Sequence, residues 1–388
     1  MFTHRDDPTR TATIEVQSPD PAVVVVAYTD SKGGTRKKTF KNALLYRAHD
    51  AALRFLLNQE GFVIRGPQPG GLRWMTKILQ PYRGMIGHAV DPETGVVWVA
   101  DAIDHAHRIA PDSLAEVELA LDSGNTSPGC LAAATAGGAG FVLMLSWQRR
   151  PEGGLVRILR LVRLSPDGRE AAVWAHVVSG NGLSSLEADA AGRVLGPCSE
   201  GAALYGPDGQ VVQRWALEPT TEGGNPQGAL SRNGEWVVFI TGATCQRVHL
   251  PSGRTHAFDA DIRQLYRVQV ADDGTPFVTA RIGIPYGLFA LGDGPPRRLT
   301  EALGAEVSHD GRWVIETLVN QVRLRDAQQR DDYDLAPIVR EGHFPVLGAA
   351  KTGHTRFGRP GRVVVMTDAY TLAEIDLDRL DPPTEEND

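Results

Sequence analysis

The stretch Ser231-Arg-Asn-Gly-Glu-Trp-Val-Val-Phe-Ile240 joins a tight turn to a strand that is apolar at every position. The Asn-Gly pair tolerates the positive backbone angles that a reversal of the chain needs. The residues from Trp236 to Ile240 are all aromatic or β-branched, as is typical of strands. Because both faces of such a strand are apolar, both have to be covered. The stretch therefore predicts a sheet with a neighbouring sheet on either side.

Similar turn-and-strand units recur along the 388-residue chain at a nearly constant interval. One series of turns has a mean spacing near 44 residues and contains Gly95, Gly140, Gly192, Gly234, Gly274, Gly311 and Gly361. A second series, out of phase with the first, contains Asp167-Gly168, Asp208-Gly209, Ser252-Gly253 and Asp293-Gly294. Asp-Gly pairs between strands are typical of primed hairpin turns. Two hairpins in a period of about 40 to 50 residues indicate one propeller blade per repeat.

We therefore expect a mainly β protein, a seven-bladed β-propeller over residues 71–380. A small α+β module and a Pro/Gly linker are expected in residues 1–70, and an acidic flexible tail at 381–388. The blades are expected to start near Met85, Cys130, Ser184, Pro226, Tyr266, Leu303 and Pro345. The last repeat lacks an outer strand, and the segment near residues 73–80 is predicted to supply it and to close the ring, which removes two sheet edges.

Three turns, Ser231–Trp236, Ser308–Trp313 and Ser165–Gly168, resemble the recurrent Ser-x-Asp-Gly turn of the WD40-like β-propeller superfamily. The Trp-Asp dipeptide and the Gly-His pair of true WD40 blades are absent. The resemblance implies an architecture and leaves ligand and partner open.

Composition and charge describe an ordinary soluble protein, with 42% hydrophobic and 22% charged residues. A net charge of -7 argues against a surface that coats nucleic acid. Cys130, Cys198 and Cys245 lack the number and spacing of a disulfide framework or a zinc site, which favours a cytoplasmic location. The polar first residues show no secretory signal. Cys130–Trp147 is free of charge, but its Gly- and Ala-rich centre predicts a hairpin rather than a membrane span.

The N-terminal residues predict strands and one helix. Val23–Tyr28 is strand-like, and apolar residues recur at helical spacing between Leu45 and Leu56. Between them lies a basic patch made of Lys32, Arg36, Lys37, Lys38 and Lys41. This order resembles the WGR domain of some DNA-damage proteins, although the Trp-Gly-Arg tripeptide is missing. The patch is either a solvated charged face or a site for nucleic acid or a partner.

Two groups of side chains are candidate metal ligands. The denser one contains Asp101, Asp104, His105 and His107, because a His-x-His pair on a strand places both imidazoles on one face. The other would lie in the central channel, where the innermost strands offer His88, Glu187, Asp189, Gln269 and Glu306.

The channel group resembles lactonase-type propellers only through the string Asn181-Gly182-Leu183. In those enzymes an analogous Glu/Asn/Asp set holds a divalent cation. Other expected inner strands consist mainly of small residues, such as Ala132–Ala136 and Gly348–Ala350. Small residues favour a packed channel over a reactive one.

The leading functional hypothesis is a non-catalytic protein-interaction scaffold without a cofactor. Its expected setting is a bacterial multi-component signalling or defence system, in which it would be an accessory subunit with a protein partner and no membrane contact. One alternative is a divalent-metal-dependent, lactonase-type hydrolase with His88, Glu187, Asp189 and Glu306 in the channel. Another is a nucleic-acid-binding adaptor that uses the basic patch. No residue is assigned a catalytic or cofactor-binding role.

Overall fold

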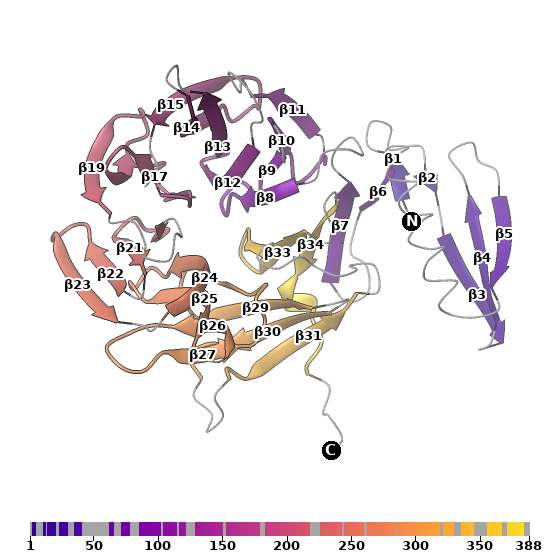
Figure 1. The fold of residues 1–388 in the computed structure, drawn as a ribbon. Helices are drawn as coiled ribbons and strands as arrows, with labels where there is room; N and C mark the ends of the chain where they lie inside the picture. The colour runs from indigo at the N-terminus through magenta and orange to yellow at the C-terminus, as the bar shows by residue number, and fades with distance from the viewer. Residues whose placement is uncertain are drawn as a thin grey trace.

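The computed structural model is built almost entirely of β-strands, and its sheets stand in a ring (Figure 1). It describes residues 71–383 except 78–84, 102–103, 115, 122–128, 150–152, 179–182, 218–225, 243, 260–261, 284, 319–320, 330–334, 345–354 and 367–370. Before residue 71 it describes the backbone of six strands. The predicted helix between Leu45 and Leu56 lies outside the described residues.

The first three blades are four-stranded antiparallel sheets. Blade 1 contains β8 (Met85–Val90), β9 (Val97–Asp101), β10 (His105–Ile109) and β11 (Glu116–Ala120). Blade 2 contains β12 (Gly129–Ala136), β13 (Ala139–Arg149), β14 (Leu155–Leu164) and β15 (Ala171–Val178). Blade 3 contains β16 (Glu187–Ala188), β17 (Val194–Cys198), β18 (Gly201–Tyr205) and β19 (Val211–Ala216).

The next three blades repeat the same strand order. Blade 4 contains β20 (Gln227–Leu230), β21 (Trp236–Thr241), β22 (Thr244–His249) and β23 (Arg254–Asp259). Blade 5 contains β24 (Ile262–Val270), β25 (Pro276–Ile282), β26 (Tyr286–Ala290) and β27 (Arg297–Thr300). Blade 6 contains β28 (Glu306–Val307), β29 (Trp313–Leu318), β30 (Gln321–Asp326) and β31 (Ile338–His343). Together with blade 7, described next, these six blades confirm the predicted seven-bladed propeller.

Blade 7 combines strands from both ends of the chain. Its inner strands are β32 (Thr355–Phe357), β33 (Arg362–Met366) and β34 (Thr371–Asp376), and β7 (Leu72–Lys77) pairs antiparallel with β34. The sheet then continues outward through β6 (Phe62–Arg65), β1 (Phe2–His4) and β2 (Thr11–Ala12). The predicted domain boundary at residue 70 falls between β6 and β7. These two strands pair with each other in one sheet, and the boundary stays a prediction.

A separate three-stranded sheet of β3 (Ile14–Asp20), β4 (Val23–Thr29) and β5 (Thr35–Phe40) also lies in the N-terminal region. The end of the expected tail, residues 384–388, lies outside the described residues.

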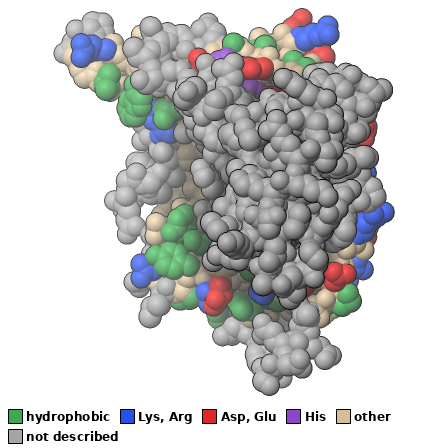
Figure 2. Space-filling model, turned by 90° about the vertical axis from the view of Figure 1, so that its right-hand side faces the viewer, with side chains coloured by type: hydrophobic (Ala, Val, Ile, Leu, Met, Phe, Trp, Pro, Cys, Tyr) green, Lys and Arg blue, Asp and Glu red, His purple; other side chains and the backbone are tan. Residues whose placement is uncertain are grey.

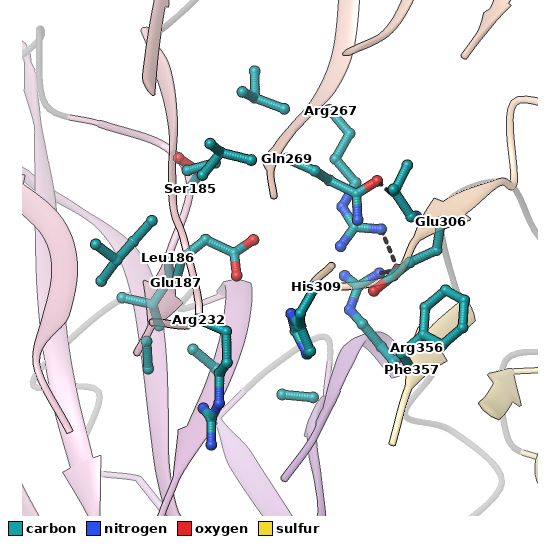
Figure 3. A pocket seen from close by; sticks show the side chains of 18 of the residues that line it. Ser185, Leu186, Glu187, Arg232, Arg267, Gln269, Glu306, His309, Arg356 and Phe357 are labelled. Carbon is teal, nitrogen blue, oxygen red and sulfur yellow. Dashed lines mark hydrogen bonds and ion pairs between the residues drawn. The ribbon is translucent and has the colours of Figure 1, made fainter. Parts of the chain in front are cut away.

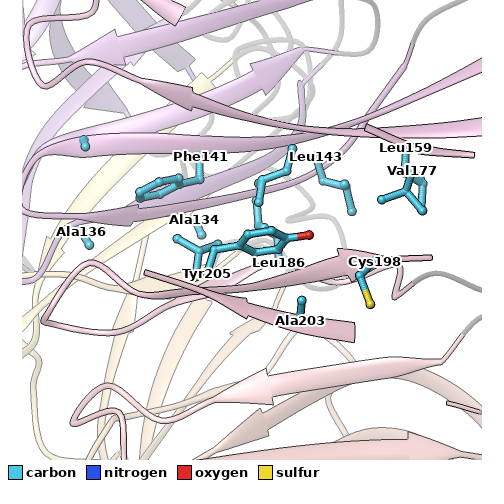
Figure 4. Close-up of a cluster of buried hydrophobic side chains, with 13 residues drawn as sticks. Ala134, Ala136, Phe141, Leu143, Leu159, Val177, Leu186, Cys198, Ala203 and Tyr205 are labelled. Atoms are coloured by element: carbon cyan, nitrogen blue, oxygen red, sulfur yellow. The ribbon is translucent and has the colours of Figure 1, made fainter. Parts of the chain in front are cut away.

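The core of the propeller lies between the blades. Buried apolar side chains form seven clusters in the described part of the chain, one at each interface between neighbouring blades. In β21, Val237 and Phe239 pack toward blade 3, whereas Val238 and Ile240 pack toward blade 5. Figure 4 shows the cluster between blades 2 and 3. Alternate residues thus serve two interfaces, which explains why the second strands are apolar at successive positions.

The turns that follow the innermost strands explain the Ser-x-Asp/Asn-Gly-x-Trp pattern. The Oγ of Ser308 accepts a hydrogen bond from the backbone N–H of Trp313 at 2.9 Å, and Ser231 makes the same bond to Trp236 at 2.9 Å. Gly311 has a φ of +72°, in the left-handed region that favours glycine. The serine therefore ties the turn to the start of the second strand.

Blade 2 departs from the expected turn positions. Its first turn lies at Gly137 and Gly138, not at Gly140, which is part of β13. A Cβ at Gly140 would lie 2.5 Å from the ring of Trp98 in blade 1. Glycine at this position provides space for the indole ring.

The second series of turns is not of the primed type that the Asp-Gly pairs predicted. Gly168 has a φ of +77°, but the preceding Asp167 does not have a positive φ. The backbone N–H of Gly168 donates to the carbonyl of Ser165 at 2.9 Å, which closes an ordinary turn before a glycine in the left-handed region. A type I′ turn needs positive φ angles at both central residues and a type II′ turn at the first one, and Asp167 avoids that cost.

Cys130–Trp147 forms most of the β12–β13 hairpin. In the part of the chain that the structure describes, no helix is long and apolar enough to cross a membrane.

Replacing Trp98 by alanine is expected to lower the free energy of unfolding by about 3–5 kcal/mol. The side chain is fully buried, and its Nε1 donates to the carbonyl of Gly138 at 2.9 Å, so the change removes packing and an inter-blade hydrogen bond. Urea unfolding followed by circular dichroism measures the loss. Trp147→Ala is the matched control, because the exposed Trp147 should change stability by less than about 0.5 kcal/mol. Equal losses in both variants would contradict this account of the core.

Candidate functional site

A cavity of about 250 Å³ occupies the centre of the ring. The innermost strands of all seven blades line it, so its wall combines residues that lie far apart in the sequence. Three cationic and two anionic side chains reach this wall, and they are Arg232, Arg267, Arg356, Glu187 and Glu306. Charged groups inside a channel need partners or a ligand, because the surrounding protein replaces their hydration.

Glu306 links three blades in one wall of the channel. Its Oε2 accepts hydrogen bonds from Nη1 of Arg267 at 2.5 Å and from Nη1 of Arg356 at 2.8 Å (Figure 3). Arg267 comes from β24 of blade 5, Glu306 from β28 of blade 6 and Arg356 from β32 of blade 7. Two guanidinium groups thus share one carboxylate, and this wall keeps a net positive charge.

The pKa values of the three groups reflect this arrangement. Burial alone would raise the pKa of Glu306, but the charges of Arg267 and Arg356 outweigh it and hold that pKa below its usual value. The pKa of Arg356 is lowered by burial first and then by the charge of Arg267. Burial opposes the charge of Arg267 too, yet Glu306 raises its pKa. Glu306 is therefore ionised at neutral pH, and the arginines repel each other across it.

Glu187 stands on the opposite wall, on β16 of blade 3, with its carboxylate directed toward the middle of the cavity (Figure 3). Among the described residues it makes no side-chain hydrogen bond or ion pair. Burial raises the pKa of Glu187 against the opposing effect of Arg267 and Arg356, and Glu306 adds to the rise. The channel therefore places two arginine side chains and their shared carboxylate opposite a single carboxyl group.

Two further side chains enter the channel from the turns between first and second strands. His309 follows Ser308 in blade 6, and its ring points into the cavity (Figure 3). Burial lowers the pKa of His309, so its imidazole is neutral at physiological pH. Arg232 occupies the equivalent position in blade 4, where its Nη1 donates to the carbonyl of Thr135 at 3.3 Å.

The turns themselves are joined from blade to blade. The backbone N–H of Asp272 donates to the carbonyl of His309 at 2.8 Å, and that of Ala190 donates to the carbonyl of Arg232 at 2.8 Å. The backbone N–H of Asn233 donates to Oδ1 of Asp272 at 2.8 Å. These bonds hold the side chains at this mouth of the channel in fixed positions.

The structure brings together only part of the channel set expected to bind a metal. Glu187, Gln269, Glu306 and His88 line the cavity, but Nε2 of His88 lies 3.1 Å from the carbonyl of Val364. Asp189 does not line it: its Oδ2 accepts a hydrogen bond from Nε of Arg193 at 2.6 Å within a turn.

The guanidinium groups around Glu306 oppose a divalent cation at that carboxylate. The metal set and the lactonase activity stay predictions.

The second candidate metal group lies in blade 1, at the end of β9 and the start of β10. Figure 2 shows histidine beside Asp or Glu side chains at the top of the face that it presents. Possible ligand atoms of Asp101, Asp104 and His105 all lie within 4.8 Å of one another. Nδ1 of His105 is 2.7 Å from Oδ1 of Asp104. Nδ1 of His107 instead lies 2.9 Å from Oε1 of Glu116, so the His-x-His pair does not converge.

Nucleophilic side chains near the channel are engaged elsewhere. The Oγ of Ser185 donates to the carbonyl of Gly228 at 2.7 Å and accepts from its backbone N–H at 2.8 Å. Cys130, Cys198 and Cys245 are all buried, and burial raises the pKa of Cys130 and of Cys245 to about 12. What the channel offers is charged hydrogen-bond donors, which suit binding of an anion.

Sequence reasoning missed Arg232, Arg267, Arg356 and His309. Arg267 lies two residues before Gln269 on the same strand, so strand alternation was a signal that included it. Arg356 was missed because the innermost strand of blade 7 was expected near Gly348–Ala350, whereas β32 spans Thr355–Phe357. No sequence signal marked His309, which is directed inward by its place in a turn.

The basic patch is only partly within the described residues. Arg36, Lys37 and Lys38 lie on β5, whereas Lys32 and Lys41 lie outside them. Binding of nucleic acid or a partner through this patch stays a prediction.

Replacing Glu306 by glutamine is expected to lower the free energy of unfolding by about 3–5 kcal/mol, because two largely buried guanidinium groups lose their shared counter-charge. The difference from the wild type should be constant at neutral pH. It should shrink as the pH falls below the usual carboxyl pKa of 4.5, since a lowered pKa contributes stability only above that value and loses it on protonation in the folded state. Urea titrations at several pH values test this, and a difference that does not depend on pH would contradict it.

No known sequence family matches this chain, and no curated protein matches it in sequence. Solved structures match its fold. The β-propeller domain of Cps50 (Swd1) from Myceliophteria thermophila gives a TM-score of 0.52 at 10% identity, over 78% of this chain and 98% of that one. U3-55K gives a TM-score of 0.54 at 11% identity, over 80% of this chain and 100% of that one. At this identity the likeness shows the fold alone. In fold, the chain is therefore a seven-bladed β-propeller similar to these two solved structures.

Proposed function

We propose that this protein is an interaction scaffold that binds a protein partner on one face of the propeller. We call it the connection face: it carries the chain connections between blades and the turns between second and third strands. The observation that carries the proposal is a set of four exposed large apolar side chains: three lie near strand ends at this face, and the fourth, Tyr266 in the middle of β24, lies beside one of them, Tyr286. They are Trp147, Leu155, Tyr266 and Tyr286, with 43%, 64%, 43% and 37% of their surface exposed.

The hairpin of β13 and β14 projects from the connection face. In the described residues, Trp147–Arg149 and Leu155–Arg157 pair only with each other, because the ladders with β12 and β15 end at Leu145 and Ile158. Strand alternation puts Trp147 in the same row as Leu143 and Leu145, which pack toward blade 3. The apolar surface with which blade 2 packs against blade 3 therefore continues onto the hairpin, past the edge of blade 3.

A second apolar site lies on the same face at the mouth of the channel. Tyr266 is the extra residue of a β-bulge in β24, between Leu265 and Arg267, and bulges redirect side chains. Its ring lies 6.3 Å from that of Tyr286, over which the guanidinium of Arg281 stacks at 5.3 Å. Aromatic and arginine side chains dominate binding energy at protein interfaces.

The chemistry of the two sites indicates the chemistry of the partner. Arg149 stands directly opposite Leu155 in the hairpin, and Arg281 covers Tyr286. A partner segment with an apolar anchor next to Asp or Glu would complement both sites. The narrower hypothesis of an accessory subunit in a bacterial multi-component signalling or defence system stays a prediction, as does the cytoplasmic location, which rests on the cysteine content.

Replacing Trp147 and Leu155 together by serine is expected to weaken partner binding by about thirtyfold or more, the effect of removing an interface hot spot. The wild-type chain is used to capture a stoichiometric partner from its native host, and the purified pair is then measured by calorimetry.

The matched control replaces Val173 and Val212 by serine, because their exposed fractions of 57% and 61% are similar but they lie near the opposite face. The control should bind as the wild type does, and circular dichroism should show equal folding of all three proteins. Unchanged affinity in the hairpin variant, or equal loss in the control, would refute the docking face.

A further inference from the structure

We propose that the central channel binds a small organic anion, a carboxylate or phosphate compound, between Arg267 and Arg356 on one wall and Glu187 on the other. This inference goes beyond the scaffold function and does not depend on the connection face. The ligand would be held inside the ring, whereas the protein partner would bind outside it.

The first argument is the charge of the arginine wall. Glu306 neutralises one of two guanidinium groups, and both are largely buried, with 18% and 22% of their side chains exposed. In the described residues, the guanidinium of Arg267 donates to Glu306 alone. Since an arginine has five N–H donors in a planar fork that matches a carboxylate or a phosphate, donors of Arg267 remain for a ligand.

The second argument is the space in front of these donors. The cavity of about 250 Å³ is slightly smaller than the roughly 300–1,000 Å³ of pockets for drug-sized ligands. It therefore suits a compound of a few carbon atoms or a single phosphate group, and it excludes a folded peptide. Ala133, Ala134, Ala229 and Gly87 in its wall leave this space open.

The third argument is the polarity of the opposite wall. The carboxyl group of Glu187 faces the cavity without a hydrogen-bond or ion-pair partner among the described residues (Figure 3). It would accept a hydrogen bond from a hydroxyl or amino group of the ligand while repelling a second anionic group. This favours a compound with its anionic group at one end only, and the neutral His309 below it adds a further hydrogen-bonding group.

The test uses isothermal titration calorimetry of the full chain with two probes, lactate and inorganic phosphate, in a chloride-free buffer. Binding of lactate alone assigns a carboxylate ligand, and binding of phosphate alone assigns a phosphate ligand. Arg267→Gln is expected to weaken binding about tenfold to a hundredfold, the effect of losing charged hydrogen bonds. Arg254→Gln, which alters an exposed arginine on the outermost strand of blade 4, should bind as the wild type does.

The Glu187→Gln variant distinguishes a direct effect of Glu187 on the ligand from an effect on the folding of the protein. At the alkaline end of a pH series, where the carboxyl group of Glu187 is ionised, removing its negative charge should strengthen phosphate or lactate binding about threefold or more. Loss of structure would only weaken binding, so this change has the opposite sign. The proposal is overturned if neither probe binds at about 10 mM, if Arg267→Gln binds as tightly as the wild type, or if Glu187→Gln weakens binding.

Discussion

Every blade depends on being covered on both faces, because a four-stranded sheet of this size cannot bury its own apolar side chains. Alternate residues of β21 or β33 belong to two different clusters, so each blade is stabilised only when both neighbours are present. A fully buried Val or Leu contributes about 1.5–3 kcal/mol. The ring is thus the smallest unit in which all seven clusters are complete, and its stability is shared around the circle.

The same constraint creates the channel. Blades that pack through their flat faces bring seven inner strands to one axis, where their side chains meet without a sheet to cover them. Blades 1 and 2 contribute mainly small or apolar residues to this space, whereas blades 3 to 7 each place a charged side chain there. Glu306 tolerates burial because two arginines surround it, and the serine turns fix the wall around it. A rigid frame with fixed charges is well suited to recognising a small polar molecule.

The sequence predicted the features that depend on local interactions and recur in every blade. Glycines at turns and apolar second strands recur because each blade needs them, and six of the seven blades start within four residues of the expected position. The seventh differs because β32 begins only at Thr355. For the site, Glu187 and Glu306 were identified from their strands, but the partnership of Glu306 with Arg267 and Arg356 joins three blades. Such a contact depends on the rotation between neighbouring sheets, which no local sequence pattern encodes. In addition, the bulge at Tyr266 interrupts the inward and outward alternation of side chains along β24.

The pairing of β7 with β34 affects how the molecule is made. Lys77 lies opposite Thr371, so the pair of strands that closes the ring joins two segments far apart in the sequence. During synthesis the early segment leaves the ribosome long before its companion exists, and contacts of such sequence separation form slowly. A nascent chain therefore spends most of its time as an open arc with two unsatisfied edges. Truncation of the final thirty or so residues would leave that arc permanently open and prone to associate with other copies.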